Sequence, residues 1–287
     1  VYATASGTLP NGKPVIVNSD GTVSVVAGTD AGFGSKTNIS GTDGNGSIYK
    51  IAFDSGSNKI VFGYRDGNSN TAAVVGTVSG TSISFGTPAV MESVSSSLIN
   101  AIYDSNADKT VFFYRGSGGA GTAVVGTVSG TNISFGSKVT VASNASSTTG
   151  AFDSNSNKVV LSYRDEGNSS YGTSRVGTIS GTDISFGTAK VFLSSNTQNL
   201  DSTFDSNSNK IVVAYRNRGS SSVGTAIVGT VSGTNISFGS SAIFNNANSV
   251  YIRCAFDSNS NKVVIIYKDG GNSSNGTAVV ATVSGTS

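Results

Sequence analysis

The chain has 287 residues, of which 37 are glycine, one is cysteine and none is histidine or tryptophan. Without histidine the chain has no Ser-His-Asp triad and no His-ligated metal, and a single cysteine forms neither an internal disulfide nor a cysteine zinc site. A net charge of +2 is too small to predict nucleic-acid binding, and no apolar run reaches the roughly 18 residues of a membrane span. The composition therefore predicts a protein without metal, cofactor or nucleic-acid partner.

Residues 1–30 predict an N-terminal β arm. Strands are expected at 14–18 and 22–26, joined by the turn Ser19-Asp20-Gly21. Residues 1–8 lack the basic and apolar segments of a signal peptide. We expect this arm to dock the chain to a larger assembly.

The rest of the chain is dominated by an internal repeat. A Phe/Tyr-Asp-Ser segment recurs five times, about every 50 residues, and each copy is followed by a Tyr-Arg or Tyr-Lys pair and a Ser-Gly-Thr turn. The repeats cover residues about 47–90, 98–141, 148–193, 199–244 and 250–287.

Each repeat predicts four short strands, A to D. In the third repeat these are 149–153, 158–164, 173–180 and 184 to about 193, rich in Val, Ile, Thr and aromatic residues. The B strand of the fourth repeat, 211–215, is apolar on both faces, which indicates a sheet covered on both sides. The sequence therefore predicts an all-β protein, a β-propeller of four-stranded antiparallel blades.

The links between strands predict where a ligand would bind. The A-to-B turn (153–157) and the C-to-D turn (180–183) are short and nearly constant, whereas the B-to-C link (165–172) and the D-to-A link (194–199) are longer and variable. Both variable links emerge on the same face of the disc, and we expect binding there.

The number of blades depends on the N-terminal region. The fifth repeat stops where its D strand should start, and residues 27–34 match the C-to-D junction 180–187. A strand at 33–39 would therefore complete a five-bladed ring over 31–287 and remove its free edges. The alternative is six blades, with 1–40 as a shortened blade.

The candidate ligand-binding residues are the five cations that end the B strands and an aromatic residue in a variable link. They are Arg65, Arg115, Arg164, Arg216, Lys268 and Tyr171. A ring of such cations could grip an anionic glycan or a carboxylate. The alternative is structural: the tyrosines fill gaps between blades, and each cation pairs with the following acid or with backbone carbonyls. Those acids are Asp66, Asp165 and Asp269; Arg115 and Arg216 lack one.

Two further patterns have a functional and a structural interpretation. The Asp-x-Asn-x-Asn turns, such as Asp153 to Asn157, resemble the start of a calcium loop, but a lysine follows and no bidentate glutamate does, so an Asx turn is favoured. Glu166 and Asp201 occur once and lie in variable links, which suggests a paired-carboxylate glycosidase or ordinary surface acids.

A few single residues depart from the repeat. Cys254 is predicted to be a small buried apolar residue on an inner strand. Arg175, Arg218 and Arg253 are cations without counterparts in the other copies, which makes them of more interest than the repeated ones.

The sequence resembles two groups of known proteins. The C-to-D hairpin, SGTDISF at 180–186, resembles the Asp-box turn of sialidase-type (BNR) propellers, although it lacks the central glycine and Asp183 is Ser82 or Asn132 elsewhere. This resemblance implies a fold and carries over no catalytic arginines. Repeats such as NKVVLSYRD (157–165), and the N-terminal segment 6–23, look like parts of virion-associated and tail-fibre proteins of marine bacteriophages.

These observations predict a non-enzymatic β-propeller, extracellular or virion-associated, that serves in attachment or recognition. Glycans or cell surfaces are its expected ligands, bound multivalently, and residues 1–30 are expected to contact other virion or surface-assembly proteins. A purely structural virion, fibre or decoration protein and a degenerate sialidase-like glycosidase are the alternatives, and a homo-oligomer is left open.

Overall fold

The structure is a computed structural model. It describes residues 4–5, 7–8, 15–18, 20, 22–25, 33–39, 50–96 and 98–286. Within these ranges the only helical element is a short 3-10 turn, Ser117–Gly119, so none of the described segments is a helix able to cross a membrane. The chain divides into two compact units, one of Val1–Thr37 with Ser79–Ser82 and one of Asn38–Val78 with Ile83–Ser287.

The first unit contains the predicted N-terminal hairpin. Strand β1 (Val15–Val17) pairs antiparallel with β2 (Val23–Val25). The Asp20 carboxylate accepts hydrogen bonds from the backbone N–H of Thr22 (2.9 Å) and from its hydroxyl (2.7 Å). This Asx-type contact fixes the turn that the sequence predicted.

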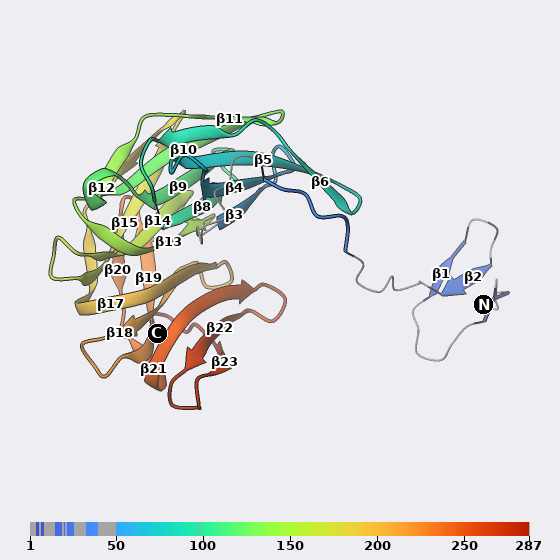
Figure 1. The fold of residues 1–287 in the computed structure, drawn as a ribbon. Helices are drawn as coiled ribbons and strands as arrows, with labels where there is room; N and C mark the ends of the chain where they lie inside the picture. The colour runs from blue at the N-terminus through green and yellow to red at the C-terminus, as the bar shows by residue number, and fades with distance from the viewer. Residues whose placement is uncertain are drawn as a thin grey trace. The chain divides into compact units, whose positions relative to one another are not determined.

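In the second unit every repeat forms an antiparallel meander (Figure 1). The first two repeats comprise β3 (Lys50–Asp54), β4 (Lys59–Arg65), β5 (Thr71–Ser79), β6 (Ser82–Phe85), β7 (Ala89–Glu92), β8 (Ile99–Asp104), β9 (Lys109–Arg115), β10 (Gly121–Ser129), β11 (Asn132–Phe135) and β12 (Val139–Ala142). The other three comprise β13 (Ala145–Asp153), β14 (Lys158–Asp165), β15 (Tyr171–Ser180), β16 (Asp183–Phe186), β17 (Lys190–Asp205), β18 (Lys210–Asn217), β19 (Val223–Ser232), β20 (Asn235–Phe238), β21 (Ala242–Asp257), β22 (Lys262–Asp269) and β23 (Asn275–Ala281).

The D strand differs from its prediction in two ways. First, the D strand is split in two. In the third repeat its two parts are β16 and the start of β17, and residues 187–189 lie between them. In the third and fourth repeats its second part continues without a break into the next A strand, so the predicted D-to-A link at 194–199 is wrong. The chain stays extended there because β15 pairs with the first half of β17 and β18 with the second. As a result β13 to β23 form one eleven-stranded sheet.

The A strands of successive repeats pack beside one another, which makes them the inner strands of the unit (Figure 1). The B strands of the second to fourth repeats, β9, β14 and β18, are buried on both faces, and residues 211–215 of β18 are all buried, as predicted. In the fifth repeat β22 is buried on one face only, and Ile266 on its other face is 52% exposed. The core therefore lies between consecutive repeats. One cluster joins Phe113 of the second repeat to Leu161 and Tyr163 of the third, with the Phe113 and Tyr163 rings 5.9 Å apart, edge to face.

A glycine governs how closely successive repeats approach. The glycine that follows each Ile-Ser-Phe lies against the backbone of a threonine in the next repeat's C-to-D turn, and an added methyl group would overlap that threonine's carbonyl oxygen. The pairs are Gly86 with Thr131, Gly136 with Thr182, Gly187 with Thr234, and Gly239 with Thr286. Only a residue without a side chain fits there.

Residues 33–39 are not a strand in the structure, and within the described residues β23 pairs with β22 alone. The predicted closing ladder is therefore not observed. Two local contacts nevertheless follow the repeat. In the first unit Gly34 lies against Thr81, as Gly86 lies against Thr131. In the second unit Ile39 packs against Tyr64 and its neighbours in the first repeat.

Candidate functional site

The five predicted cations end the B strands at matching positions. Arg164 on β14 pairs with Gly172 on β15, and Arg216 and Lys268 pair with the equivalent glycines of later repeats. The preceding tyrosines point the opposite way, into the core; Tyr163 and Tyr215 are each 1% exposed. Tyrosine therefore fills the space between repeats, as predicted, while the cation faces outward.

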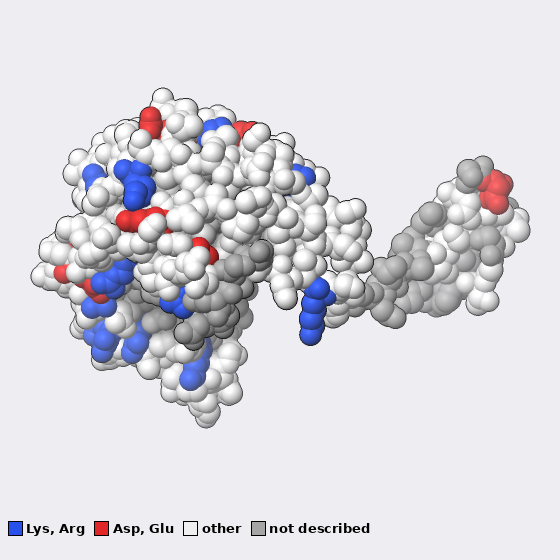
Figure 2. Space-filling model, turned by 45° about the horizontal axis from the view of Figure 1, so that its top comes forward, with Lys and Arg blue, Asp and Glu red and all other residues white. Residues whose placement is uncertain are grey.

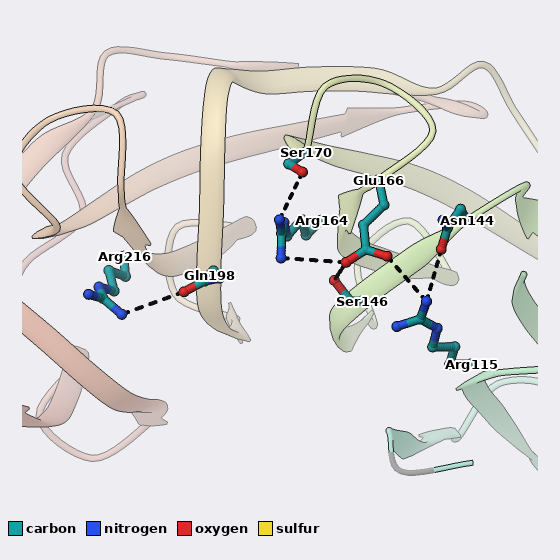
Figure 3. Close-up of polar contacts among 8 residues, drawn as sticks. All are labelled: Arg115, Asn144, Ser146, Arg164, Glu166, Ser170, Gln198 and Arg216. Carbon is teal, nitrogen blue, oxygen red and sulfur yellow. Dashed lines mark hydrogen bonds and ion pairs between the residues drawn. The ribbon is translucent and has the colours of Figure 1, made fainter. Parts of the chain in front are cut away.

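Arg115, Glu166 and Arg164 form a bridge between the second and third repeats (Figure 3). Nη2 of Arg115 lies 3.2 Å from Oε2 of Glu166, and Nη1 of Arg164 lies 3.4 Å from Oε1. The Ser146 hydroxyl donates to Oε1 at 2.8 Å, and the Asn144 amide oxygen accepts from Arg115 at 3.2 Å. The side chains of Arg115, Glu166 and Arg164 are 37%, 23% and 20% exposed, so solvent reaches all three.

Of the other three cations, Arg216 and Arg65 have hydrogen-bond partners of their own. Arg216 donates to the Gln198 amide oxygen at 3.5 Å and to the Ser222 hydroxyl at 3.1 Å. Burial and the nearby charge of Arg218 lower the pKa of Arg216. Arg65 donates to the Ser95 hydroxyl at 3.1 Å. Lys268 is exposed at the end of β22.

The expectation that each cation pairs with the acid after it is wrong. Successive strand residues point to opposite faces, so Asp165 points away from Arg164, whereas Glu166, two residues on, points toward it. The acids stabilise the B-to-C links instead. Asp66 accepts from the N–H of Asn70 at 2.7 Å, and Asp269 from that of Gly271 at 2.8 Å. Burial raises the pKa of Asp165, and backbone N–H groups oppose this shift.

Tyr171 begins β15, where it pairs with Asp165 of β14 and with Asn196 of β17, and it is half-buried. The aromatic residue predicted to bind a ligand thus lies at the end of a B-to-C link, where β15 begins. On the face that Figure 2 shows, Lys and Arg occur in small groups on a mostly uncharged surface, several of them next to carboxylates.

The two single acids lie in separate hydrogen-bond networks. Glu166 belongs to the arginine bridge, whereas Asp201 accepts from the Thr149 hydroxyl at 3.1 Å and from the backbone N–H of Cys254 at 3.0 Å. Asp201 lies on β17, in its inner-strand half. This arrangement does not support the paired-carboxylate hypothesis.

The Asp-x-Asn-x-Asn segments are Asx turns. Asp153 accepts from the N–H of Asn155 (2.9 Å) and Ser156 (3.0 Å) and from the Ser156 hydroxyl (2.7 Å), and Asp205 and Asp257 repeat the pattern. Asn157 has a left-handed backbone, with φ 54°, which asparagine tolerates. In the described part of the chain no three His, Cys, Asp or Glu residues are placed to hold a metal ion.

Arg175 and Cys254, two residues that depart from the repeat, are structural. Arg175 donates to the backbone oxygens of Gly187 (3.0 Å) and Val141 (2.7 Å), and its guanidinium lies over the Phe186 ring. It therefore ties the second repeat to the third. Cys254 is only partly buried, which differs from the prediction, and it packs against an apolar cluster of the fourth and fifth repeats. Desolvation raises the pKa of its free thiol well above the ordinary value, so the residue behaves as a small apolar group.

Sequence reasoning singled out Asp201 and Arg253 separately, but it missed that they belong to a set of polar residues on the inner strands. Each lies four residues before the aspartate of a Phe/Tyr-Asp-Ser segment, so every repeat supplies one: Lys50, Asn100, Thr149, Asp201 and Arg253. We call this set the inner polar ring. An alignment of the five repeats could have revealed this set, because the position holds a polar residue in every repeat and a different one in each.

No protein-family model and no curated protein sequence matches the chain. Solved structures do match. A triple arginine mutant of AofleA from Arthrobotrys oligospora has a TM-score of 0.56 at 10% identity, covering 86% of this chain and 72% of that one. SapL1 lectin in complex with α-methyl fucoside has 0.53 at 12%, covering 82% and 76%. A mutant Aleuria aurantia lectin in complex with a fucosylated GlcNAc has 0.51 at 9%, covering 82% and 78%.

At these identities the likeness concerns the fold alone. The chain is an all-β protein of antiparallel sheets whose arrangement is that of lectin β-propellers, in agreement with the predicted class and blade layout.

Proposed function

We propose that this chain is a carbohydrate-binding β-propeller that recognises cell-surface glycans and catalyses no reaction. The observation that carries the proposal is the bridge of Arg115, Glu166 and Arg164, with its surrounding amide and hydroxyl groups, beside the variable links. The likeness to lectins that were solved with fucosides supports it.

The chemistry of the bridge suits sugars. A sugar hydroxyl both donates and accepts, and it is held best by planar groups whose donors and acceptors are fixed in advance. The bridge offers guanidinium donors, a carboxylate acceptor and the Asn144 amide, and its members hold one another in place. Similar but smaller groups, Arg216 with Gln198 and Arg65 with Ser95, lie in other repeats. Several weak sites on one face would bind a glycan-covered surface by avidity.

A structural role is the second candidate, because each described arginine of the B-strand ends already has a partner within the protein. The chain would then be a fibre or decoration protein. For either role we propose an extracellular or virion location, with residues 1–30 as the docking arm. The compact first unit with its own hairpin is consistent with such an arm.

We also propose that residues 33–39 complete a fifth blade by pairing with β23. In the third and fourth repeats a phenylalanine five residues after the Ile-Ser-Phe-Gly glycine covers a glycine of the C strand: Phe192 covers Gly172, and Phe244 covers Gly224. The equivalent Gly276 has nothing within 4 Å. Ile39 lies five residues after Gly34 and would cover Gly276 in a closed ring.

A glycan array separates the two candidate roles. The full chain would be compared with Arg115→Ala, which leaves Glu166 its partner Arg164, and with Lys262→Ala, a matched charge loss at the A-to-B turn. We expect the intact chain and Lys262→Ala to bind the same glycans, and Arg115→Ala to bind them at least about tenfold more weakly, the loss of roughly one charge-assisted hydrogen bond. Absence of binding by the intact chain would instead favour the structural role.

A further inference from the structure

Three members of the inner polar ring line a cavity in the second unit. The cavity has a volume of about 360 Å³, and its walls come from the inner strands of all five repeats. Lys50, Asn100 and Arg253 of the ring line it directly, and Thr149 and Asp201 adjoin lining residues in the chain. A cavity of this size accommodates a single small ligand, since small-molecule sites begin at about 300 Å³.

The wall of the cavity contains strained backbone at one position of three successive inner strands. Ser147, Asn199 and Tyr251 have left-handed backbones, with φ of 45°, 50° and 56°, and each lies at a register shift of its strand. Residues other than glycine adopt this conformation at a cost, because the Cβ atom crowds the backbone. All three residues line the cavity, and the Asn199 amide oxygen accepts the N–H of Tyr251 at 3.0 Å. Strain that recurs at one site of a fold is typical of binding sites.

The charges of the ring favour an anion. Lys50 and Arg253 come from the first and last repeats and line the same cavity. Burial lowers the pKa of Lys50; the charge of Asp201 opposes this shift, and the smaller effect of the Arg253 charge adds to it. Asp201 is the ring's single carboxylate, and both of its oxygens already accept hydrogen bonds. An anion between Lys50 and Arg253 would relieve their mutual repulsion.

The other residues that line the cavity suit a sugar-like ligand, a cyclic molecule that carries hydroxyl groups. Gln198 and Asn199 provide amide groups, and the buried Asn100 amide is itself fixed by the carbonyl (2.9 Å) and hydroxyl (2.7 Å) oxygens of Thr148. Leu200 and the exposed Tyr251 supply apolar surface. Few polar groups set among apolar walls are what fix the orientation of a small ligand.

We propose that this cavity binds one acidic monosaccharide, a sugar carboxylic acid, with its carboxylate between Lys50 and Arg253 and its hydroxyl groups on the amide side chains. The site is separate from the arginine bridge: the two have no residue in common, and each can be tested without the other.

The test is calorimetric titration of the full chain with D-glucuronate, methyl β-D-glucuronide and D-glucose. We expect both acids to bind and D-glucose to bind at least tenfold more weakly. Arg253→Ala, an exposed residue whose loss should leave the fold intact, should weaken binding of the acids at least tenfold, while Lys262→Ala leaves it unchanged. Circular dichroism would confirm that Arg253→Ala is folded.

The glucuronide distinguishes the source of the ligand. Equal affinity for both acids would indicate the end of a glycan chain, and affinity for the free acid alone a free metabolite; either result supports the site. The proposal is overturned if neither acid binds, if D-glucose binds as tightly as the acids, or if folded Arg253→Ala binds them like the intact chain.

Discussion

At the scale of single residues, short polar side chains bonded to nearby backbone organise this protein. The aspartates that end the inner strands accept the N–H groups of the following turn, and an asparagine or aspartate with a left-handed backbone closes it, as Asn157 does. The sequence predicted these turns because their chemistry is local. It did not predict the partners of Arg115 and Arg164, because Glu166 reaches Arg115 only after two repeats have packed together.

Asn157 offers a direct test of the turn. Asn157→Ala should lower the free energy of unfolding by about 1 kcal/mol, because alanine pays the full cost of the left-handed conformation, whereas Asn157→Gly should not be destabilising. Urea denaturation would measure both. Asn155→Ala serves as the control and should change stability by less than about 0.5 kcal/mol. Equal losses in Asn157→Ala and Asn157→Gly would show that the asparagine side chain, and not its backbone conformation, matters.

The equivalent turn of the fifth repeat allows a test on the pKa of Asp257. A hydrogen bond from the Ser260 hydroxyl, helped by backbone N–H groups, lowers the pKa of Asp257 below its ordinary 3.8. Because the folded-state pKa is the lower one, the stabilisation is present above the unfolded pKa and is lost as the pH falls through the folded value. Ser260→Ala should therefore raise the pKa of Asp257 in an NMR titration. An unchanged pKa would mean that the hydroxyl does not hold the carboxylate.

At the scale of elements, the repeat correctly predicted those strands in which the local composition is typical of a strand and the packing keeps the chain extended. It failed at 194–199, where Ser, Asn, Thr and Gln are typical of a loop but pairing with β15 and β18 keeps the chain extended. The inner polar ring as a set was not predicted for a similar reason: the A strands were recognised, but not that three of their polar positions line one cavity.

The glycine contact between repeats is an element-scale prediction. Gly136→Ala should lower the free energy of unfolding by about 2 kcal/mol, because the new methyl group overlaps the Thr182 backbone and the two repeats must separate. Chemical denaturation measures the loss, and Ser134→Ala on the exposed face of β11 is the control. A Gly136→Ala protein as stable as the control would contradict the tight approach of the repeats.

At the scale of the whole molecule, ring closure can be tested by a disulfide. Val191 pairs with Thr173 in the third repeat, and by the same register Asn38 should pair with Thr277. Asn38→Cys with Thr277→Cys, in a Cys254→Ala background, should form an intrachain disulfide on mild oxidation, since Cα atoms of paired strands lie about 4.5–5.5 Å apart. Lys36→Cys with Thr277→Cys is the out-of-register control. Only intermolecular disulfides, or equal yields in both variants, would contradict closure by this segment.

The central claim is that glycans bind beside the variable links, at the bridge of Arg115, Glu166 and Arg164. Its most direct test is an amide NMR titration of the full chain with the glycan that binds most strongly on the array. The account predicts saturable shifts concentrated at Asn144, Glu166 and Ser170 and lost in Arg115→Ala. Shifts confined to the A-to-B turns around Asn155 and Asn207, or the absence of any saturable shift, would contradict it.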